Sequence, residues 1–133
     1  MRDGRTRKLE VTEHQESFET FLAGKRAVVV VLSGEAAGTE YEIRKPNLSV
    51  GRAEPSDWIF EDDTLSKEHA ALEYVEGTIR LRDLGSMNGT LVNGTESKSA
   101  ELKNGDRFQL GQHQFQFVLE DRRRGPKTYV VES

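Results

Sequence analysis

The chain has 133 residues, a formal net charge of −4, 35% hydrophobic residues and no cysteine. This length suits a single domain, and the lack of cysteine excludes a disulfide framework, thiolate metal ligands and a thiol nucleophile. Because no apolar run is long enough to span a membrane and no signal-peptide pattern is present, we expect a cytoplasmic protein without a membrane partner.

The charge is unevenly distributed along the chain. Residues 1–8 and residues 122–133 each carry a net charge of +3, whereas residues 9–121 carry −10. An acidic body lacks the broad cationic face that phosphate backbones require, so we expect no nucleic-acid partner. We interpret residues 122–133 as a basic linker or as the start of a further region.

Residues 1–25 form an N-terminal tail without strand alternation. Thr12 and Gln15 have the spacing of a capping box ahead of three apolar residues, which predicts a short amphipathic helix over residues 13–22 that ends near Gly24. A helix of this length is marginally stable alone, so the alternative is a tail that becomes ordered on docking.

From Ala27 onward the sequence is typical of β-strands. The β-branched run over residues 28–32 predicts a strand buried on both faces. Residues 40–43 alternate between polar and apolar and predict a strand with one wet face. We expect these two strands to pair across a turn at residues 33–38.

Further along the chain, residues 69–75 and 78–84 flank Glu76-Gly77 and predict a β-hairpin. Residues 107–110 and 114–119 each offer one apolar face. Many short strands with frequent turns and no helical crossover indicate an all-β protein, a two-sheet antiparallel β-sandwich.

Three polar clusters occupy the expected turns between apolar strands. They are Gly51-Arg52, Ser66-Lys67-Glu68-His69 and Ser86-Met87-Asn88-Gly89-Thr90. Together they supply a guanidinium, an ammonium, a hydroxyl, a carboxamide and several turn N–H groups, which is an inventory for binding an anion. No metal-ligand spacing or nucleophile motif accompanies them, so we expect no enzyme activity, metal or cofactor.

These clusters resemble the forkhead-associated (FHA) domain family, whose pattern is Gly-Arg, then Ser-x-x-His, then Asn-Gly. The likeness extends over roughly residues 26–119 and includes Asp57-Trp58-Ile59, the run 84–94 and the run 102–106. The resemblance implies an FHA domain over residues 26–121, with about eleven strands and loops at one end that bind phosphothreonine peptides.

The resemblance also implies roles for single residues. Arg52 matches the arginine that binds phosphate, and Ser66 matches the hydroxyl that donates to it. Lys67 would meet the phosphate as a point charge. Asn88 matches the amide that binds the peptide backbone. Met87 stands where the family often has Ser or Thr, and we expect it to line the pocket for the threonine methyl group.

Three further residues are implied to shape the loops. Gly51 and Gly89 would hold loop conformations, and His69 matches a histidine that orders the loops through internal hydrogen bonds. The acidic run 61–63 lacks the alternating ligand spacing of a calcium loop and is interpreted as a solvated loop. Near the pocket, this run should disfavour acidic residues at the third position after the phosphothreonine.

The resulting hypothesis is a signalling module that binds a partner phosphorylated by a Ser/Thr kinase. In the family a phosphorylated tail can occupy the domain's own pocket, and the candidate phosphoacceptors are Thr6, Thr12 and Thr20. The module would regulate a linked or associated output domain, such as a diguanylate cyclase. The alternative is a structural protein–protein assembly module of the same fold that does not bind phosphopeptides.

Overall fold

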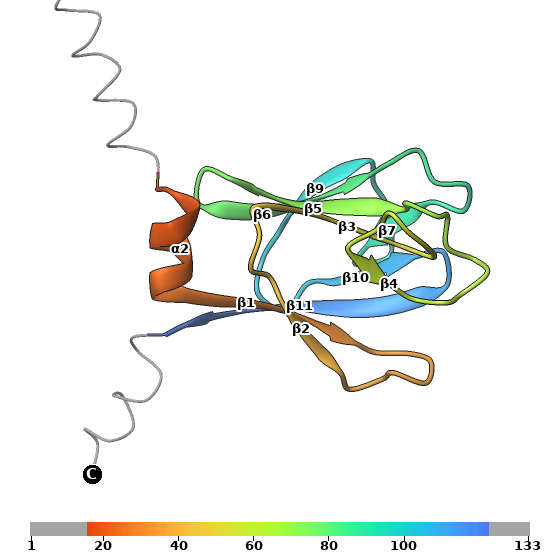
Figure 1. The fold of residues 1–133 in the computed structure, drawn as a ribbon, viewed down its shortest axis with the longest axis horizontal. Coiled ribbons are helices and arrows are strands. Elements are labelled where there is room, and N and C mark those ends of the chain that lie inside the picture. Colours follow the sequence, from red (N-terminus) through yellow and green to blue (C-terminus); the bar gives the residue numbers. More distant parts are fainter. Residues whose placement is uncertain (1–15, 123–133) are drawn as a thin grey trace, which may run out of the picture.

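The computed structural model describes residues 16–122, which form two β-sheets packed face to face with one short helix at one end (Figure 1). The six-stranded sheet has the order β2-β1-β11-β10-β7-β8, and the five-stranded sheet has the order β4-β3-β5-β6-β9. The strands are β1 (Lys25–Val31), β2 (Glu40–Glu42), β3 (Asn47–Gly51), β4 (Trp58–Ile59), β5 (Ala70–Val75), β6 (Thr78–Asp83), β7 (Thr90–Val92), β8 (Thr95–Glu96), β9 (Ser99–Leu102), β10 (Arg107–Leu110) and β11 (His113–Asp121), and the helix is α2 (Phe18–Gly24). The predicted two-sheet sandwich is confirmed.

The first and last strands pair with each other along their whole length. β1 runs antiparallel to β11, from Lys25 opposite Asp121 to Val31 opposite Phe115. The predicted pairing of β1 with β2 is confirmed, with Val29 opposite Tyr41. Of the predicted run 28–32, Val28, Val29 and Val31 are buried, whereas Val30 and Leu32 are half-buried.

The predicted hairpin is formed by β5 and β6. Its two-residue turn has φ of 44° at Glu76 and 87° at Gly77, the left-handed pair of a tight hairpin turn. Leu72 lies opposite Leu81, so both point into the core from neighbouring strands.

One strand pair departs from the antiparallel arrangement. β4 runs parallel to β3, with Val50 opposite Trp58 and Gly51 opposite Ile59. Asp57, the residue before β4, is bonded to Ser49 of β3 and so holds the two strands side by side. Its backbone N–H donates to the Ser49 carbonyl at 3.0 Å, and its carboxylate accepts the Ser49 N–H at 2.9 Å. The five-stranded sheet is therefore mixed at its β4 edge.

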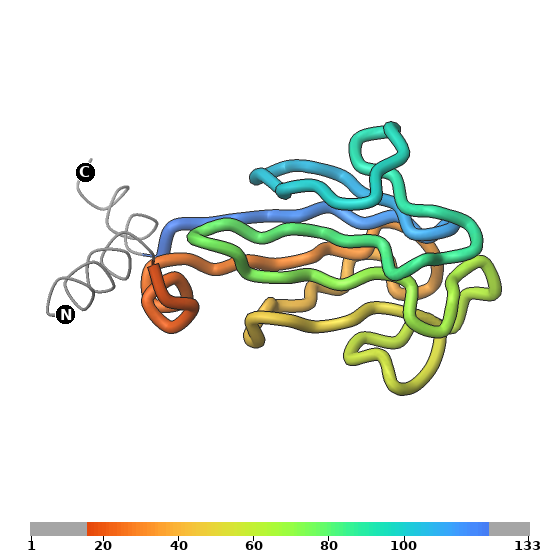
Figure 2. The backbone as a smooth tube through the Cα atoms, turned by 90° about the horizontal axis from the view of Figure 1, so that it is seen from above, coloured from red at the N-terminus to blue at the C-terminus, as the bar shows by residue number. Residues whose placement is uncertain are grey.

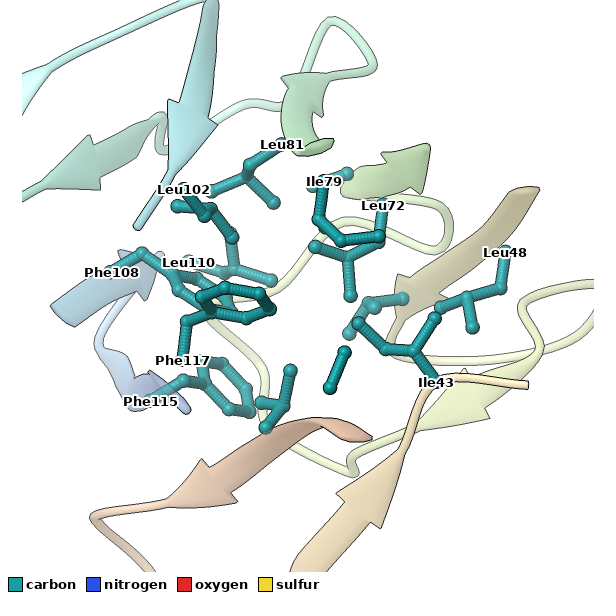
Figure 3. Packing of buried hydrophobic residues seen from close by; sticks show 14 of the residues in the cluster. Ile43, Leu48, Leu72, Ile79, Leu81, Leu102, Phe108, Leu110, Phe115 and Phe117 are labelled. Atoms are coloured by element: carbon teal, nitrogen blue, oxygen red, sulfur yellow. The ribbon is translucent and has the colours of Figure 1, made fainter. Parts of the chain in front are cut away.

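The core lies between the inner faces of the two sheets (Figure 3). Phe115 and Phe117 point into it from β11, and the Phe108 and Phe115 rings stack with centroids 5.1 Å apart. Fully burying a side chain of this kind contributes about 1.5–3 kcal/mol of transfer free energy, so this packing provides the rigid frame that holds the loops.

Helix α2 begins later than the sequence predicts. Its N-cap is Ser17, whose hydroxyl oxygen accepts the N–H of Thr20 at 3.1 Å. The predicted helix over 13–22 begins outside the described residues, as does the Thr12–Gln15 capping box. Within the described part, residues 16 and 17 are not helical, because the Ser17 cap sets the start at Phe18, and Gly24 ends the helix as predicted.

Aromatic packing holds α2 against the end of the five-stranded sheet. Phe21 is fully buried, and its ring lies 5.1 Å from that of Tyr74, centroid to centroid. The Tyr74 hydroxyl donates to the Glu16 carbonyl. On the other side, Nε of Arg122 donates to the carbonyls of Leu22 at 2.8 Å and Lys25 at 3.1 Å.

The two ends of the sandwich differ. Helix α2 and the β5–β6 turn lie at one end, and the loops between β3 and β4, β4 and β5, β6 and β7, and β10 and β11 lie at the other (Figure 2). The single helix among residues 16–122 has seven residues, and no helix of this part is long and apolar enough to cross a membrane.

Candidate functional site

Arg52 directly follows β3 and is anchored to the β4–β5 loop (residues 60–69). Its backbone N–H donates to the Ser66 carbonyl at 2.9 Å, and its Nε donates to the Leu65 carbonyl at 3.0 Å. Neither terminal Nη atom is bonded to another residue of the described chain. A guanidinium fixed in this way presents its remaining donors to a ligand.

Gly51 allows the β4–β5 loop to approach the end of β3. A β carbon at this position would lie 1.9 Å from the Lys67 carbonyl oxygen and 2.5 Å from the Ser56 hydroxyl oxygen. Such distances are far inside van der Waals contact, so only glycine fits without moving the backbone. The Ser56 hydroxyl also donates to the Lys67 carbonyl at 2.6 Å and holds the loop there.

His69 is fully buried and joins the β4–β5 loop to the β6–β7 loop (residues 84–89). Its Nδ1 accepts the backbone N–H of Ser66 at 3.0 Å, and its Nε2 lies 2.8 Å from the Gly89 carbonyl oxygen. Since Nδ1 accepts, the proton of the neutral ring is on Nε2 and is donated to Gly89. Both ring nitrogens are thus used internally, and His69 has no free nitrogen for acid–base chemistry.

Ser66 carries a hydroxyl with a defined direction. Its Oγ accepts the backbone N–H of Met87 at 3.0 Å. Because one lone pair is occupied in this way, the hydroxyl proton is free to be donated to a ligand. Met87 itself presents its side chain to solvent, with 88% of the residue exposed.

Asn88 is exposed at the tip of the β6–β7 loop. Its Nδ2 donates to the Thr64 carbonyl at 2.9 Å, which fixes the amide plane and leaves Oδ1 and the second N–H available. The next residue, Gly89, has a φ of 87°, a conformation that favours glycine. The Gly111 N–H donates to the Gly89 carbonyl at 3.2 Å, so the β10–β11 turn also supports this loop.

Sequence reasoning missed Asp83, the residue that shapes the β6–β7 loop. Its carboxylate accepts from the Ser86 hydroxyl at 2.6 Å, the Thr90 hydroxyl at 2.7 Å and the backbone N–H groups of Gly85 and Ser86. Burial opposes ionisation, but these hydrogen bonds outweigh it and lower the pKa of Asp83 to about 2. The signal in the sequence is an Asp three residues before a Ser in a Gly-containing turn.

The acidic run 61–63 is only partly the solvated loop that we predicted. Glu61 and Asp63 are exposed, but Asp62 is half-buried. Its carboxylate accepts from the Thr64 hydroxyl at 2.7 Å and from Nδ1 of His113 at 2.8 Å. The hydrogen bond from Thr64, followed by that from His113, lowers the pKa of Asp62 to about 2. No group of acidic or histidine residues in the described part is arranged to hold a metal ion.

The structure brings most of the predicted site residues to one end of the sandwich. Arg52 and Ser66 are half-buried, and Lys67 and Asn88 are exposed. His69 ties the loop of Ser66 and Lys67 to the loop of Asn88, and Arg52 is bonded to the first of these loops. Thr20 is exposed in the first turn of α2, at the opposite end (Figure 1). The other candidate acceptors, at positions 6 and 12, lie outside the described residues. The cluster offers several hydrogen-bond donors and two cations to one ligand, which suits an anion.

Comparison with known proteins gives consistent matches. Residues 30–121 match the family model described as "Inner membrane component of T3SS, cytoplasmic domain", an FHA-type domain. The glycogen accumulation regulator GarA of Mycolicibacterium smegmatis is 37% identical over 102 residues, which cover 77% of this chain and 61% of GarA. An oxoglutarate dehydrogenase inhibitor of Corynebacterium efficiens is 36% identical over 92 residues, covering 69% of this chain and 65% of the inhibitor. The chain thus spans less than two thirds of the length of these relatives.

Among solved structures, one comes from a study described as "Structural and functional analysis of phosphothreonine-dependent FHA domain interactions". It is 25% identical to this chain with a TM-score of 0.64, and the match covers 70% of this chain and 95% of the solved one. The residues matched by the family model, 30–121, include all the loops that carry the candidate site.

Proposed function

The chain belongs to the forkhead-associated domain family, and from this premise we propose that residues 26–121 bind phosphothreonine-containing peptides through the loops opposite α2. The observation that carries the proposal is the anchoring of Arg52. Its backbone N–H and Nε are bonded to the loop that bears Ser66, while neither terminal nitrogen is bonded to any of residues 16–122. A phosphate bound there would meet the guanidinium and the Ser66 hydroxyl together.

The charge and number of donors suit a phosphate monoester. A phosphothreonine carries a charge of about −1.5 to −2 and three acceptor oxygens. Arg52 and Ser66 would donate charge-assisted hydrogen bonds, each worth about 1.5–3 kcal/mol, and Lys67 would add a point charge. After the entropy cost of ordering the peptide, these contacts support reversible binding with a Kd in roughly the micromolar range.

Two residues of the β6–β7 loop would read the peptide beside the phosphate. Asn88, held by the Thr64 carbonyl, would bond the peptide backbone with its free amide groups. The exposed side chain of Met87 would cover the threonine methyl group, which phosphoserine lacks. One buried methyl group is worth about 1 kcal/mol, so a modest preference for phosphothreonine is expected.

The N-terminal tail is a second candidate ligand, and chain length limits which threonine reaches the site of its own molecule. The bond from the Tyr74 hydroxyl holds the Glu16 carbonyl near the α2 end. Tyr74 lies five positions after His69 along β5, which is about 17 Å at about 3.4 Å per residue. The candidate site lies beyond His69, so a tail residue has to cover more than this distance.

An extended chain spans at most about 3.6 Å per residue. Counted from Glu16, Thr12 therefore reaches at most about 14 Å and Thr6 about 36 Å. We propose that phosphorylated Thr6 binds the site of its own molecule, whereas phosphorylated Thr12 binds only the site of a second copy. Thr20 is held in α2 and would serve neither role while the helix is docked.

The relatives support a regulatory rather than a catalytic role. Their names describe a glycogen accumulation regulator and an oxoglutarate dehydrogenase inhibitor. We propose that this chain likewise regulates an associated enzyme after an upstream Ser/Thr kinase acts, in the cytoplasm, where kinases find ATP. A linked diguanylate cyclase stays a prediction. Because both nitrogens of His69 are engaged internally, the proposal includes no catalysis by this site.

The test is calorimetric titration of the full chain with a phosphothreonine peptide library, the matched phosphoserine library and the unphosphorylated peptides. We expect binding that prefers phosphothreonine and is lost in Arg52→Ala. The matched control is Arg107→Ala, which removes an exposed arginine from β10, away from the loops. Folded protein that binds no phosphopeptide, or binds equally well as Arg52→Ala, would contradict the proposal and favour the structural assembly module.

A further inference from the structure

A groove of about 740 Å³ lies beside the candidate site, at the edge of the sandwich where β2 and β4 end their sheets. Its apolar part comes from Tyr41, Ile59 and Phe60. The Tyr41 and Phe60 rings meet edge to face with centroids 5.2 Å apart, and 42% of Ile59 is exposed. Phe60 is buried and Tyr41 is half-buried, so Ile59 is the apolar side chain of this groove that a partner could cover.

The rim of this groove is acidic. Glu35 and Glu61 line it and are both exposed. Neither lysine nor arginine is among the described residues that line it. A surface that combines carboxylates with apolar side chains complements a segment that combines a cation with an apolar side chain.

A buried histidine adds a hydrogen-bond acceptor to the groove. Nδ1 of His113 is bonded to the Asp62 carboxylate at 2.8 Å, so this nitrogen carries a proton. Nε2 of the neutral ring is then an acceptor, and it is buried without a hydrogen-bond partner among the described residues. Buried polar atoms are normally satisfied, and His113 lines the groove, so a donor bound there could supply the missing partner.

The groove adjoins the candidate site. The Thr64 hydroxyl accepts the backbone N–H of Gln112 at 2.9 Å, and the Thr64 carbonyl accepts from Asn88 at 2.9 Å. Gln112 lines the groove and Asn88 belongs to the candidate site. One residue, Thr64, therefore connects the two, and a peptide bound at Asn88 has a short path into the groove.

We propose that this groove binds a flanking segment of the phosphorylated partner, one that places a lysine or arginine next to a large apolar residue. The cation would lie between the carboxylates of Glu35 and Glu61, with His113 Nε2 accepting a hydrogen bond, and the apolar side chain would cover Ile59. The inference rests on the proposed function, because the phosphothreonine brings the segment to the groove.

The test uses phosphothreonine peptides that differ only in a flanking pair, Lys-Leu, Glu-Leu or Lys-Ser, placed at successive positions on either side of the phosphothreonine. The readout is the ratio of the Kd values, which cancels any general change in phosphate affinity. We expect the Lys-Leu peptide to bind about tenfold more tightly than the Glu-Leu peptide at one position, and the preference to fall with added salt.

Two double variants locate the effect. Glu35→Gln with Glu61→Gln should reduce the preference for Lys-Leu to about twofold or less. Glu54→Gln with Glu101→Gln removes two exposed carboxylates that do not line the groove, and it should leave the ratio unchanged. Chemical-shift changes at Ile59 and His113 on adding the Lys-Leu peptide would support the same placement.

The outcomes separate the two proposals. If phosphopeptides bind and Arg52→Ala abolishes binding, but neither the flanking pair nor the Glu35/Glu61 variant changes the ratio, the groove proposal is wrong and the proposed function stands. A preference for Glu-Leu would also overturn the groove proposal. If no phosphothreonine peptide binds the folded wild-type chain, the proposed function fails and the groove proposal fails with it.

Discussion

Nδ1 of the buried His69 accepts the backbone N–H of Ser66, three residues earlier in the chain, at 3.0 Å. The same ring reaches the Gly89 carbonyl on the next loop with its other nitrogen. One side chain therefore sets the distance between the loop that bears Ser66 and the loop that bears Asn88. The spacing of the proposed phosphate and backbone contacts depends on a residue that touches neither ligand group.

Replacing this histidine should affect both stability and binding. In His69→Ala the Ser66 N–H loses its partner, and the Gly89 carbonyl keeps only the N–H of Gly111. A buried unsatisfied group costs about 1–3 kcal/mol, and the cavity left by the fully buried ring adds to this cost. We expect a loss of about 2–5 kcal/mol in the free energy of unfolding, measured by urea denaturation, and weaker phosphopeptide binding by the folded fraction. A folded His69→Ala protein with wild-type affinity would contradict the positioning role.

Gly51→Ala tests the close approach of the β4–β5 loop to the end of β3. A β carbon would meet the Lys67 carbonyl oxygen at 1.9 Å, so the β4–β5 loop has to move. We expect about 1–3 kcal/mol of destabilisation and a larger relative loss of phosphopeptide affinity, since Ser66 and Lys67 move with the loop. Ser56→Ala is the matched comparison, because it removes only the hydrogen bond to the Lys67 carbonyl. Equal effects of the two variants would argue against the steric explanation.

The pH dependence of stability should reveal Asp83. Its pKa is about 2 in the folded protein, below the ordinary value of 3.8 for an aspartate, so the folded state favours the ionised form. The stability that this group contributes is complete above about pH 4 and is lost as the pH falls toward 2. Asp83→Asn should therefore show a smaller drop in urea midpoint between pH 5 and pH 2 than the wild type. Parallel pH profiles for the two proteins would rule out this contribution.

The length of the N-terminal tail should decide whether a phosphorylated threonine binds the site of its own molecule or that of a second copy. A chain that keeps Thr6 as its single candidate acceptor in the tail, prepared with Thr12→Ala and Thr20→Ala, should bind its own phosphorylated tail. Its loop chemical shifts should then be independent of protein concentration. A chain that keeps only Thr12 should instead form concentration-dependent oligomers, detectable by light scattering. Concentration-independent closure of the Thr12 protein would show that α2 detaches.

Much of the fold was accessible from the sequence because its signals are local. The β5–β6 hairpin follows from Glu76-Gly77 between alternating runs, and the β1–β2 pairing follows from a buried run next to a half-buried one. The parallel pairing of β4 with β3 could not be predicted from the sequence. β4 has two residues, too few to show the alternation of polar and apolar residues that marks a strand. The pairing depends on bonds between Asp57 and Ser49, which the chain brings together only after folding.

The site divides in the same way. Arg52, Ser66 and Asn88 were identified because their spacing matches a family pattern, and the structure brings them to one end. Asp83 and the Asp62–His113 pair were missed because their role comes from burial and from partners in space, and a carboxylate in a polar turn looks solvated in a sequence. The N-cap at Ser17 was also missed, since several hydroxyl residues in the tail could begin a helix.

The pairing of the first strand with the last has a consequence for how this module is built into larger assemblies. Lys25 lies opposite Asp121, and Arg122 bonds the carbonyls of Leu22 and Lys25, so the described chain enters and leaves at the same end. The recognition loops are at the other end. The domain can therefore be carried as a side branch of a longer polypeptide, with its ligand held on the far side from whatever is attached.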